Sequence, residues 1–161
     1  MIRDYQAIQC TWFLKGQQRL IPTYGKHQGV KLIGVLNYEN GETFCVEEEQ
    51  YDAAAFLRFL QNVLEHYPEG TITMILDNAR VHHAKLIQPF LSQNKRLTLV
   101  FLPPYSPNLN LIEGLWKWLK SDVIANVFYS SVAEIRKNVQ VFLVGVNQML
   151  DVVIDRLCLK M

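Results

Sequence analysis

The chain has 161 residues, of which 50% are apolar and 19% are charged. This length and balance predict one compact soluble domain and argue against a disordered chain. No apolar run has the length of a membrane span, and the first residues lack the hydrophobic centre of a signal peptide. The three scattered cysteines argue against a disulfide framework or a zinc knuckle, and they indicate a reducing cytoplasm.

The net charge of +1 conceals three segments of different charge. Residues 1–31 hold five Lys or Arg against Asp4 alone, residues 39–52 hold six acids and no base, and residues 80–120 hold six bases against Glu113 alone. Two basic segments separated by an acidic one suit a polyanion-binding face. The alternative is an ordinary solvated surface of mixed charge, which is the commoner arrangement.

The first half of the chain predicts two hairpins and a helix. The stretches CTWFL and LIPTYG flank a short polar turn. Residues 29–38 and 42–49 flank the Asn40-Gly41 pair, which suits the positive φ angles of a tight hairpin turn. Asp52 is then expected to cap a helix, because the apolar residues from Phe56 to Leu64 recur at helical spacing.

The second half predicts strands that alternate with helices. TITMILDN (residues 71–78) and LTLVFLPP (residues 97–104) have the composition of strands buried on both faces. Residues 82–94 are expected to be helical, with a kink or restart at Pro89. A helix is expected from Leu111 to about Val127, and a last one from the capping box Ser131–Glu134. Antiparallel strands followed by strand–helix units predict an α/β fold with a mixed sheet flanked by helices.

Two carboxylates stand at positions where chemistry is expected. Asp77 follows directly after a predicted strand, and the carboxyl ends of parallel strands are where active sites gather. Glu113 lies in the first turn of a predicted helix, and Lys117 and Lys120 follow it on the same face. The structural alternatives are that Asp77-Asn78 simply turn the chain and that Glu113 belongs to a solvated stripe.

The neighbouring histidines allow a further choice. Adjacent residues on a helix diverge by about 100°, so we expect only His82 to point towards Asp77, and His83 to be a surface or packing residue. No HExxH or Cys/His spacing supplies a zinc site. The motifs of serine hydrolases, P-loop enzymes and dinucleotide enzymes are also absent from the sequence.

The combination of motifs is more specific than its parts. ILDNARVHHA followed by LVFLPPYSPNLNLIEGLWKWLK resembles the catalytic domain of DDE transposases, in the bacterial insertion-sequence branch of the mariner superfamily. In that family an Asp-Asn after a strand precedes a PPYSPxLNxIE motif and a helix that begins at the glutamate. Between Asp77 and Glu113 lie 35 residues, which is close to the spacing of that branch. The resemblance covers nearly the whole chain.

The resemblance implies a ribonuclease H-like fold and metal-dependent DNA strand cleavage and strand transfer. Asp77 and Glu113 would be the catalytic metal ligands for Mg²⁺ or Mn²⁺, since hard divalent ions prefer carboxylate oxygens. A complete site would hold two ions roughly 4 Å apart. By position, Lys117 and Lys120 are expected to follow DNA phosphates, and Tyr105, Asn110 and His82 to line the DNA path.

The family uses three acids, and the first lies at the end of a central first strand. That strand and its aspartate are expected upstream of Met1, so the chain is interpreted as an N-terminally truncated single domain without the family's helix-turn-helix region. Asp4 is the only acid before Glu39 and is the only stand-in. The alternative for Asp4 is a surface residue. Without the central strand, segments 30–38 and 71–77 would each lack a neighbouring strand. We expect a gap in the sheet between them, or a gap that another segment or chain fills.

Three functions remain open from the sequence. The first is a DDE transposase catalytic domain that is active or inactive in this form. The second is another ribonuclease H-like nuclease, and the third is a non-catalytic fragment that binds DNA or an intact transposase and regulates it. The expected partners are DNA at the element ends and target, and a second copy or an intact transposase. The expected location is the cytoplasm in association with the nucleoid, without a membrane.

Overall fold

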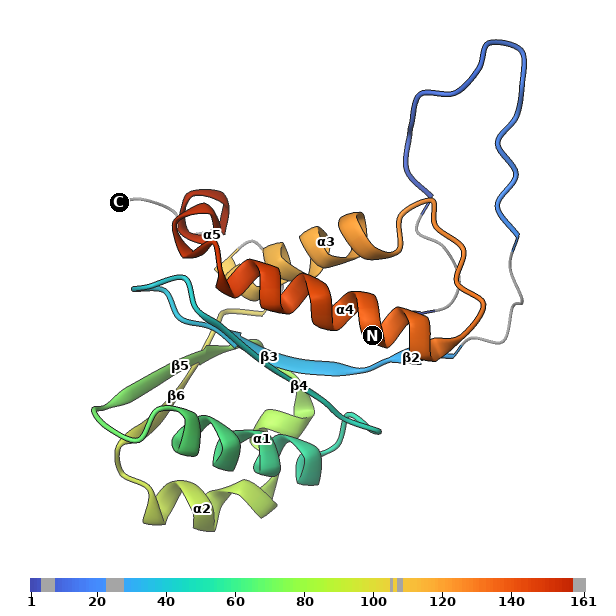
Figure 1. Cartoon of the computed structure of the whole chain (residues 1–161). Helices are drawn as coiled ribbons and strands as arrows, with labels where there is room; N and C mark the ends of the chain where they lie inside the picture. Colours follow the sequence, from blue (N-terminus) through green and yellow to red (C-terminus); the bar gives the residue numbers. More distant parts are fainter. Residues whose placement is uncertain (4–7, 23–27, 105, 107–108, 158–161) are drawn as a thin grey trace.

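Strands form the middle layer of the fold, and helices lie on both sides of it (Figure 1). The computed structural model describes residues 1–3, 8–22, 28–104, 106 and 109–157. The strands are β1 (Ile2–Arg3), β2 (Gly29–Val30), β3 (Leu32–Leu36), β4 (Thr43–Glu47), β5 (Ile72–Leu76) and β6 (Leu97–Phe101). The helices are α1 (Ala53–His66), α2 (Gln88–Gln93), α3 (Leu111–Val123), α4 (Val132–Asn147) and α5 (Leu150–Leu157). The predicted α/β class is confirmed.

Three apolar clusters hold the layers together. The first joins α1 to the strands around Phe59 and Leu60, both fully buried. The second packs α3 and α4 against β1, β2 and β3, and the third joins α3, α4 and α5 around Leu115. Asp52 caps α1 as predicted, because its carboxylate accepts a hydrogen bond of 2.8 Å from the Ala55 amide. The buried face of α1 is the one that its helical spacing predicts.

The first predicted hairpin does not form. Residues 8–22 contain no strand, although Gln17 N donates to Leu14 O at 3.1 Å and Gly16 adopts a φ of 80°. The turn is therefore present without its ladder, and the prediction of strands here is wrong for these residues. Trp12 is 99% exposed, and the segment projects away from the helices (Figure 1). An isolated hairpin with no layer to bury one face is marginal in water. Residues 23–25 of the prediction lie outside the described residues.

The second predicted hairpin is confirmed. β3 and β4 pair antiparallel, from Leu32 opposite Glu47 to Leu36 opposite Thr43. Gly41 has a φ of 77°, while Asn40 is outside the positive region, so only the glycine of the pair takes the predicted conformation. The turn is consequently wider than a two-residue connection.

The last two strands pair in parallel, with Leu76 opposite Phe101 at their carboxyl ends. The prediction that both are buried on two faces is wrong. Met74 is buried, but Ile75 is 58% exposed and its partner Val100 is 44% exposed. The reason is that α1 and the segment around Ile87 cover one face of this strand pair, as the first cluster shows.

The segment predicted as a helix over residues 82–94 is divided into three pieces. Two 3-10 turns, Arg80–His83 and Lys85–Ile87, come before α2, whose first turn contains Pro89. The predicted restart at Pro89 is thus confirmed, and the continuous helix is wrong. Proline lacks the N–H that a helix interior needs, and it is tolerated in a first turn.

The C-terminal helices also differ from their predicted bounds. α3 ends at Val123 rather than near Val127, and Asn126 beyond it has a left-handed φ of 56°. α4 begins after Ser131, whose hydroxyl accepts a hydrogen bond of 3.3 Å from the Glu134 amide, as the predicted cap requires. The chain then turns after Asn147 and forms α5, an additional helix that the sequence did not predict.

The strand pairs are not joined to one another. Within the described residues the strands form three separate two-stranded sheets, β1–β2, β3–β4 and β5–β6. The predicted gap between segments 30–38 and 71–77 is confirmed for this part of the chain. On β3 the odd-numbered residues bond to β4, since Lys31 O and Asn37 N bond to Glu48 and Glu42. The N–H and C=O groups of the even-numbered residues therefore point to the opposite edge.

One side chain covers part of this open edge of β3. The Tyr51 hydroxyl accepts a hydrogen bond from Leu32 N at 3.1 Å and donates to Leu32 O at 3.2 Å. Burial raises the pKa of this hydroxyl, and the hydrogen bond to the Leu32 backbone only partly offsets that effect. Gly34 and Leu36 have no hydrogen-bond partner for their amides within the described residues.

Amide hydrogen exchange is expected to alternate along β3. Ile33 and Val35 bond to β4 and should exchange slowly, whereas Gly34 and Leu36 face the open edge and should exchange faster. NMR-detected exchange at low protein concentration reads these four amides separately. Equal protection of all four would contradict an open edge.

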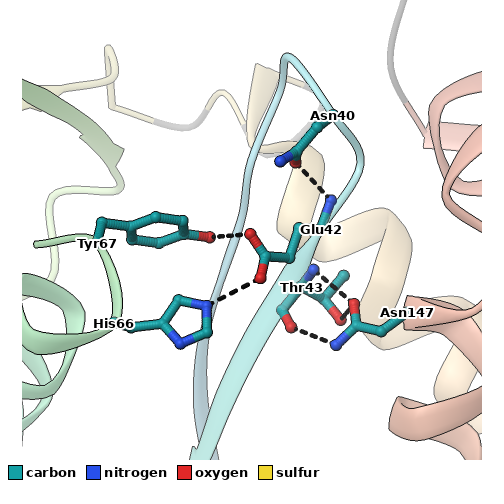
Figure 2. Close-up of polar contacts among 6 residues, drawn as sticks. All are labelled: Asn40, Glu42, Thr43, His66, Tyr67 and Asn147. Carbon is teal, nitrogen blue, oxygen red and sulfur yellow. Dashed lines mark hydrogen bonds and ion pairs between the residues drawn. The ribbon is translucent and has the colours of Figure 1, made fainter. Parts of the chain in front are cut away.

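A carboxylate clamp fixes the end of the β3–β4 hairpin to both helical layers, as Figure 2 shows. Glu42 lies 2.9 Å from His66 Nε2 and accepts a hydrogen bond of 3.0 Å from the Tyr67 hydroxyl, at the end of α1. On the other side, Thr43 N donates to Asn147 Oδ1 and Asn147 Nδ2 donates to Thr43 O, both at 2.8 Å. The hairpin that carries the open edge is therefore held in place at its turn.

The clamp should make stability depend on pH. Burial alone would raise the pKa of Glu42, but the hydrogen bonds from His66 and Tyr67 outweigh burial and the pKa is lowered. A carboxyl with a lowered pKa adds stability above its unfolded pKa of about 4.3 and loses it as the pH falls. Glu42→Gln should therefore reduce the free energy of unfolding by about 1 kcal/mol at neutral pH, and by less in acid.

Urea unfolding of both proteins at neutral pH and in acid measures this difference. Glu39→Gln is the matched control, because Glu39 lies exposed in the same hairpin turn and its carboxylate makes no ion pair with the described residues. A Glu42→Gln deficit that stayed constant from neutral pH into acid would show that the charge of Glu42 contributes nothing.

Candidate active site

The parallel pairing of β5 and β6 brings two loops together at one edge. The ladder continues past the strands, because Leu102 N donates to Leu76 O at 2.8 Å. The side-chain amide of Asn78 donates to Leu102 O and ties the loop after β5 to the loop after β6. The first loop begins with Asp77, and the second leads to α3.

Asp77 is held locally and keeps its carboxylate accessible. Its Oδ1 accepts a hydrogen bond of 3.0 Å from the Ala79 amide, and His82 Nδ1 lies 3.0 Å from its backbone oxygen and 3.2 Å from Oδ1. The Asp77 side chain remains 57% exposed. Asp77 therefore turns the chain, as the structural alternative requires, and still presents carboxylate oxygen to solvent.

Glu113 reaches the same place from α3. Asn110 occupies the N-cap position with extended backbone angles, and its carbonyl accepts a hydrogen bond of 3.0 Å from Glu113 N. The fully buried Leu115 and Leu119 fix the helix against the strands and α4. Glu113 thus lies in the first turn of an anchored helix, where a negative charge is favourable.

The two carboxylates line one pocket of about 200 Å³. Its walls come from the loop after β5, the loop after β6 and the start of α3. The lining residues are Asp77, Asn78, Leu102, Pro103, Pro104, Ser106, Asn110 and Glu113. The structure therefore brings together two acids that lie far apart in the sequence.

The histidines lie as their positions predicted. His82 contacts Asp77 and packs its ring 4.5 Å from the Phe56 ring, measured between centroids. His83 packs against Phe101 at 4.2 Å, and its Nε2 lies 3.3 Å from Asn78 Oδ1. His82 thus lies between Phe56 and Asp77 and holds the aspartate, while His83 packs over the end of β6.

The other predicted site residues separate into groups. Asn110 lines the carboxylate pocket, while Lys117 lines a different hollow. Lys120 is exposed on α3. Tyr105 and Asp4 lie outside the described residues, so the roles expected for them stay predictions.

The donor set of the pocket suits a hard divalent cation. Mg²⁺ and Mn²⁺ prefer oxygen ligands. The pocket offers two carboxylates and the side-chain oxygens of Asn78, Asn110 and Ser106. Within the described ranges no group of three or more His, Cys, Asp or Glu residues could hold a metal ion. The pocket therefore fits a metal, and its described lining supplies two acids rather than three.

Two roles were missed by the sequence reasoning. The sequence predicts Asn78 only as a turn residue, but its side-chain amide joins the two loops of the pocket. The one sequence feature that pointed to this role is its place directly after Asp77. Arg96 was counted in a basic segment, but its guanidinium donates to Leu64 O at 2.5 Å and Tyr67 O at 2.6 Å, closing the end of α1. A base next to a strand gives no sequence signal for that contact.

Part of the acidic segment pairs with the helices rather than remaining solvated. Glu47 accepts two hydrogen bonds from Arg136 on α4, at 2.7 and 2.8 Å, and Glu48 pairs with Arg58 at 2.5 Å. These pairs cross from the hairpin to α4 and α1. The acids therefore fasten the layers and lie apart from the carboxylate pocket.

The pocket joins an acid that follows one strand to a second acid on a later helix. This site and the α/β fold together define a ribonuclease H-like domain. Residues 1–136 match the family described as DDE superfamily endonuclease. The chain belongs to this family. The resemblance to transposases of the insertion-sequence and mariner group is confirmed by this match together with the relatives and solved structures that follow.

Two relatives support this assignment. The chain is 31% identical over 141 residues to the "Insertion element IS630 uncharacterized 39 kDa protein" of Shigella sonnei, a match that covers 87% of this chain and 41% of the relative. It is 34% identical over 85 residues to "Uncharacterized protein y4pE/y4sA" of Sinorhizobium fredii (strain NBRC 101917 / NGR234), covering 52% of this chain and 60% of that protein. The chain thus spans only part of the relatives it matches.

Solved structures show the same fold. The Mos1 transposase paired-end complex with left transposon end has a TM-score of 0.59 at 14% identity, covering 92% of this chain and 50% of the Mos1 chain. The Mos1 strand transfer complex gives 0.58 at 15% identity, covering 91% and 48%. Among the described residues, no helix has the length and apolar character needed to cross a membrane.

Proposed function

We propose that the chain is the catalytic domain of a transposase, for metal-dependent cleavage and transfer of DNA strands. The observation that carries the proposal is the shared pocket of Asp77 and Glu113 in a chain of the DDE endonuclease family. Mos1 is a transposase solved in complex with transposon DNA, which supports DNA as the substrate. Whole relatives are longer than this chain, so their activity enters here as a proposal.

Asp77 and Glu113 would hold a divalent cation between a strand end and a helix start. When bound, such an ion activates the attacking oxygen and stabilises the leaving oxygen at phosphorus. His82 contacts the backbone and the carboxylate of Asp77, and so orients that ligand. Asn78 keeps the two loops in register, and Asn110 and Ser106 offer polar contacts to a phosphodiester entering the pocket.

A third carboxylate would come from a strand that pairs with the open edge of β3. β1 is antiparallel to β2, with Ile2 opposite Val30, on the same edge that Leu32, Gly34 and Leu36 face. In a chain that continues upstream of Met1, residues in that register would run along β3 into the gap before β5. Such a strand would complete the sheet and carry an acid towards Asp77. Asp4 remains the alternative third acid.

The number of acids in the carboxylate pocket also supports a second function. Because the described residues place two acids in the pocket rather than three, this chain by itself would bind DNA or an intact transposase without cutting it. A second copy or an intact transposase could then supply the missing strand. The cytoplasm beside the nucleoid is the location that either function requires.

DNA nicking of a supercoiled plasmid with Mn²⁺ or Mg²⁺ tests the catalytic proposal. If the chain nicks, Asp77→Asn and Glu113→Gln should each reduce the rate by more than about 100-fold, because a metal ligand matters more than its supporting contacts. The matched controls are Asp151→Asn and Glu65→Gln, which change exposed acids outside the pocket. Nicking that survives both pocket substitutions rejects the metal-site assignment.

The two proposed functions give different results in the same assay. A chain that binds the plasmid but does not nick it, with or without divalent ions, supports the binding function for this form. Restored nicking on addition of an intact relative, lost again with Asp77→Asn in this chain, would show that the pocket works once the sheet is completed.

A further inference from the structure

A second hollow, of about 400 Å³, lies between α3, α5 and Gln9. From α3 it is lined by Gly114, Lys117, Trp118 and Ser121, whose spacing puts them on one face of the helix. From α5 it is lined by Arg156 and Leu157. None of these residues lines the carboxylate pocket, so the hollow is a separate feature that begins one residue beyond Glu113.

Gly114 leaves room on α3 for the Leu157 side chain of α5. A Cβ at Gly114 would lie 2.9 Å from Leu157 Cδ2, closer than real side chains approach. Because glycine has no side chain, Leu157 can pack against α3 here. The neighbouring Arg156 is thereby brought to the rim of the hollow.

Arg156 lies on a fixed aromatic ring. Its guanidinium carbon is 4.3 Å from the centroid of Trp118, which is a cation–π distance. The indole is buried, donates to Asp122 at 2.8 Å and meets the Phe142 ring edge-to-face at 5.4 Å. The ring cannot easily turn, and so it fixes the guanidinium at the edge of the hollow.

Among its described lining residues the hollow has two cations and no acid. Lys117 and Arg156 are both exposed, and within the described residues neither forms an ion pair. Gln9 adds a polar group, held there because Asn126 bonds to its backbone at 3.1 and 2.8 Å. Ser121 donates to the Gln9 side chain at 3.3 Å. Two cations from two helices therefore converge beside neutral polar groups.

We propose that this hollow binds a phosphate of the DNA backbone through Lys117 and Arg156. Guanidinium and ammonium groups are the usual partners of phosphate oxygens. A stacked base is a poorer occupant, because the face of Trp118 near the hollow already carries Arg156. Lys117 is one helical turn, about 6 Å, beyond Glu113. A backbone that crosses the carboxylate pocket can therefore continue into the hollow.

Only the choice of DNA as the polyanion rests on the proposed function. The test is binding of a short mixed-sequence duplex, measured by fluorescence anisotropy over a range of salt without divalent ions. Lys117→Gln and Arg156→Gln should each weaken binding and lower the slope of log affinity against log salt by about 0.9, the value for one lost phosphate contact. Arg156→Lys should keep the slope and lose less affinity, because the charge remains.

The control is Lys137→Gln, an exposed lysine on α4 that does not line the hollow, which should leave both affinity and slope unchanged. Equal melting temperatures establish that the variants are folded. An unchanged slope for Lys117→Gln and Arg156→Gln overturns the inference, as does a chain that binds no duplex. Displacement of DNA by inorganic phosphate beyond the effect of chloride at equal ionic strength would show a free-anion pocket instead, and would also overturn it. If the wild-type chain does not nick DNA but the two substitutions still lower the slope as expected, only the proposed function is contradicted.

Discussion

The candidate site depends on the parallel pairing of β5 and β6. Their register places Leu76 opposite Phe101, and Asn78 then bonds to Leu102 just beyond the strand ends. Without that pairing, Asp77 and the loop that leads to Glu113 would have no reason to meet. Parallel strands end at one edge of a sheet, so an acid that follows one strand lies close to the loop that follows the next.

The acidic residues of the chain serve two different purposes. Glu42, Glu47 and Glu48 hold the hairpin to α1 and α4 through hydrogen bonds and ion pairs. Within the described residues, neither Asp77 nor Glu113 pairs with a lysine or arginine, and both line the carboxylate pocket. This division separates acids that stabilise the fold from acids available for a ligand.

Local patterns predicted the elements well, and long-range contacts decided the rest. Alternation and caps located α1, the β3–β4 hairpin and the start of α4. The strands at residues 10–25 failed in the described part because nothing packs on Trp12, which no local pattern reveals. Ile75 is exposed for a similar reason, because the apolar composition of a strand does not show whether one or both faces of its sheet will be covered.

The same limit applies to the site. Asp77 and Glu113 could be chosen from the sequence because motif and spacing fix them, and the structure places them in one pocket. The contact of Arg156 with Trp118 joins two helices, one of which was not predicted. Such a contact depends on how α3 and α5 pack together, so the sequence alone could not place the second hollow.

The proposed function requires that Asp77 and Glu113 hold the same divalent ion. A double-mutant cycle on Mn²⁺ affinity tests it most directly, with the wild type, Asp77→Asn, Glu113→Gln and the double variant titrated by electron paramagnetic resonance. If both carboxylates hold the same ion, each single change weakens binding strongly and the double change costs less than the sum of the two. Strictly additive losses, or Mn²⁺ affinity that neither substitution changes, would contradict a shared metal site.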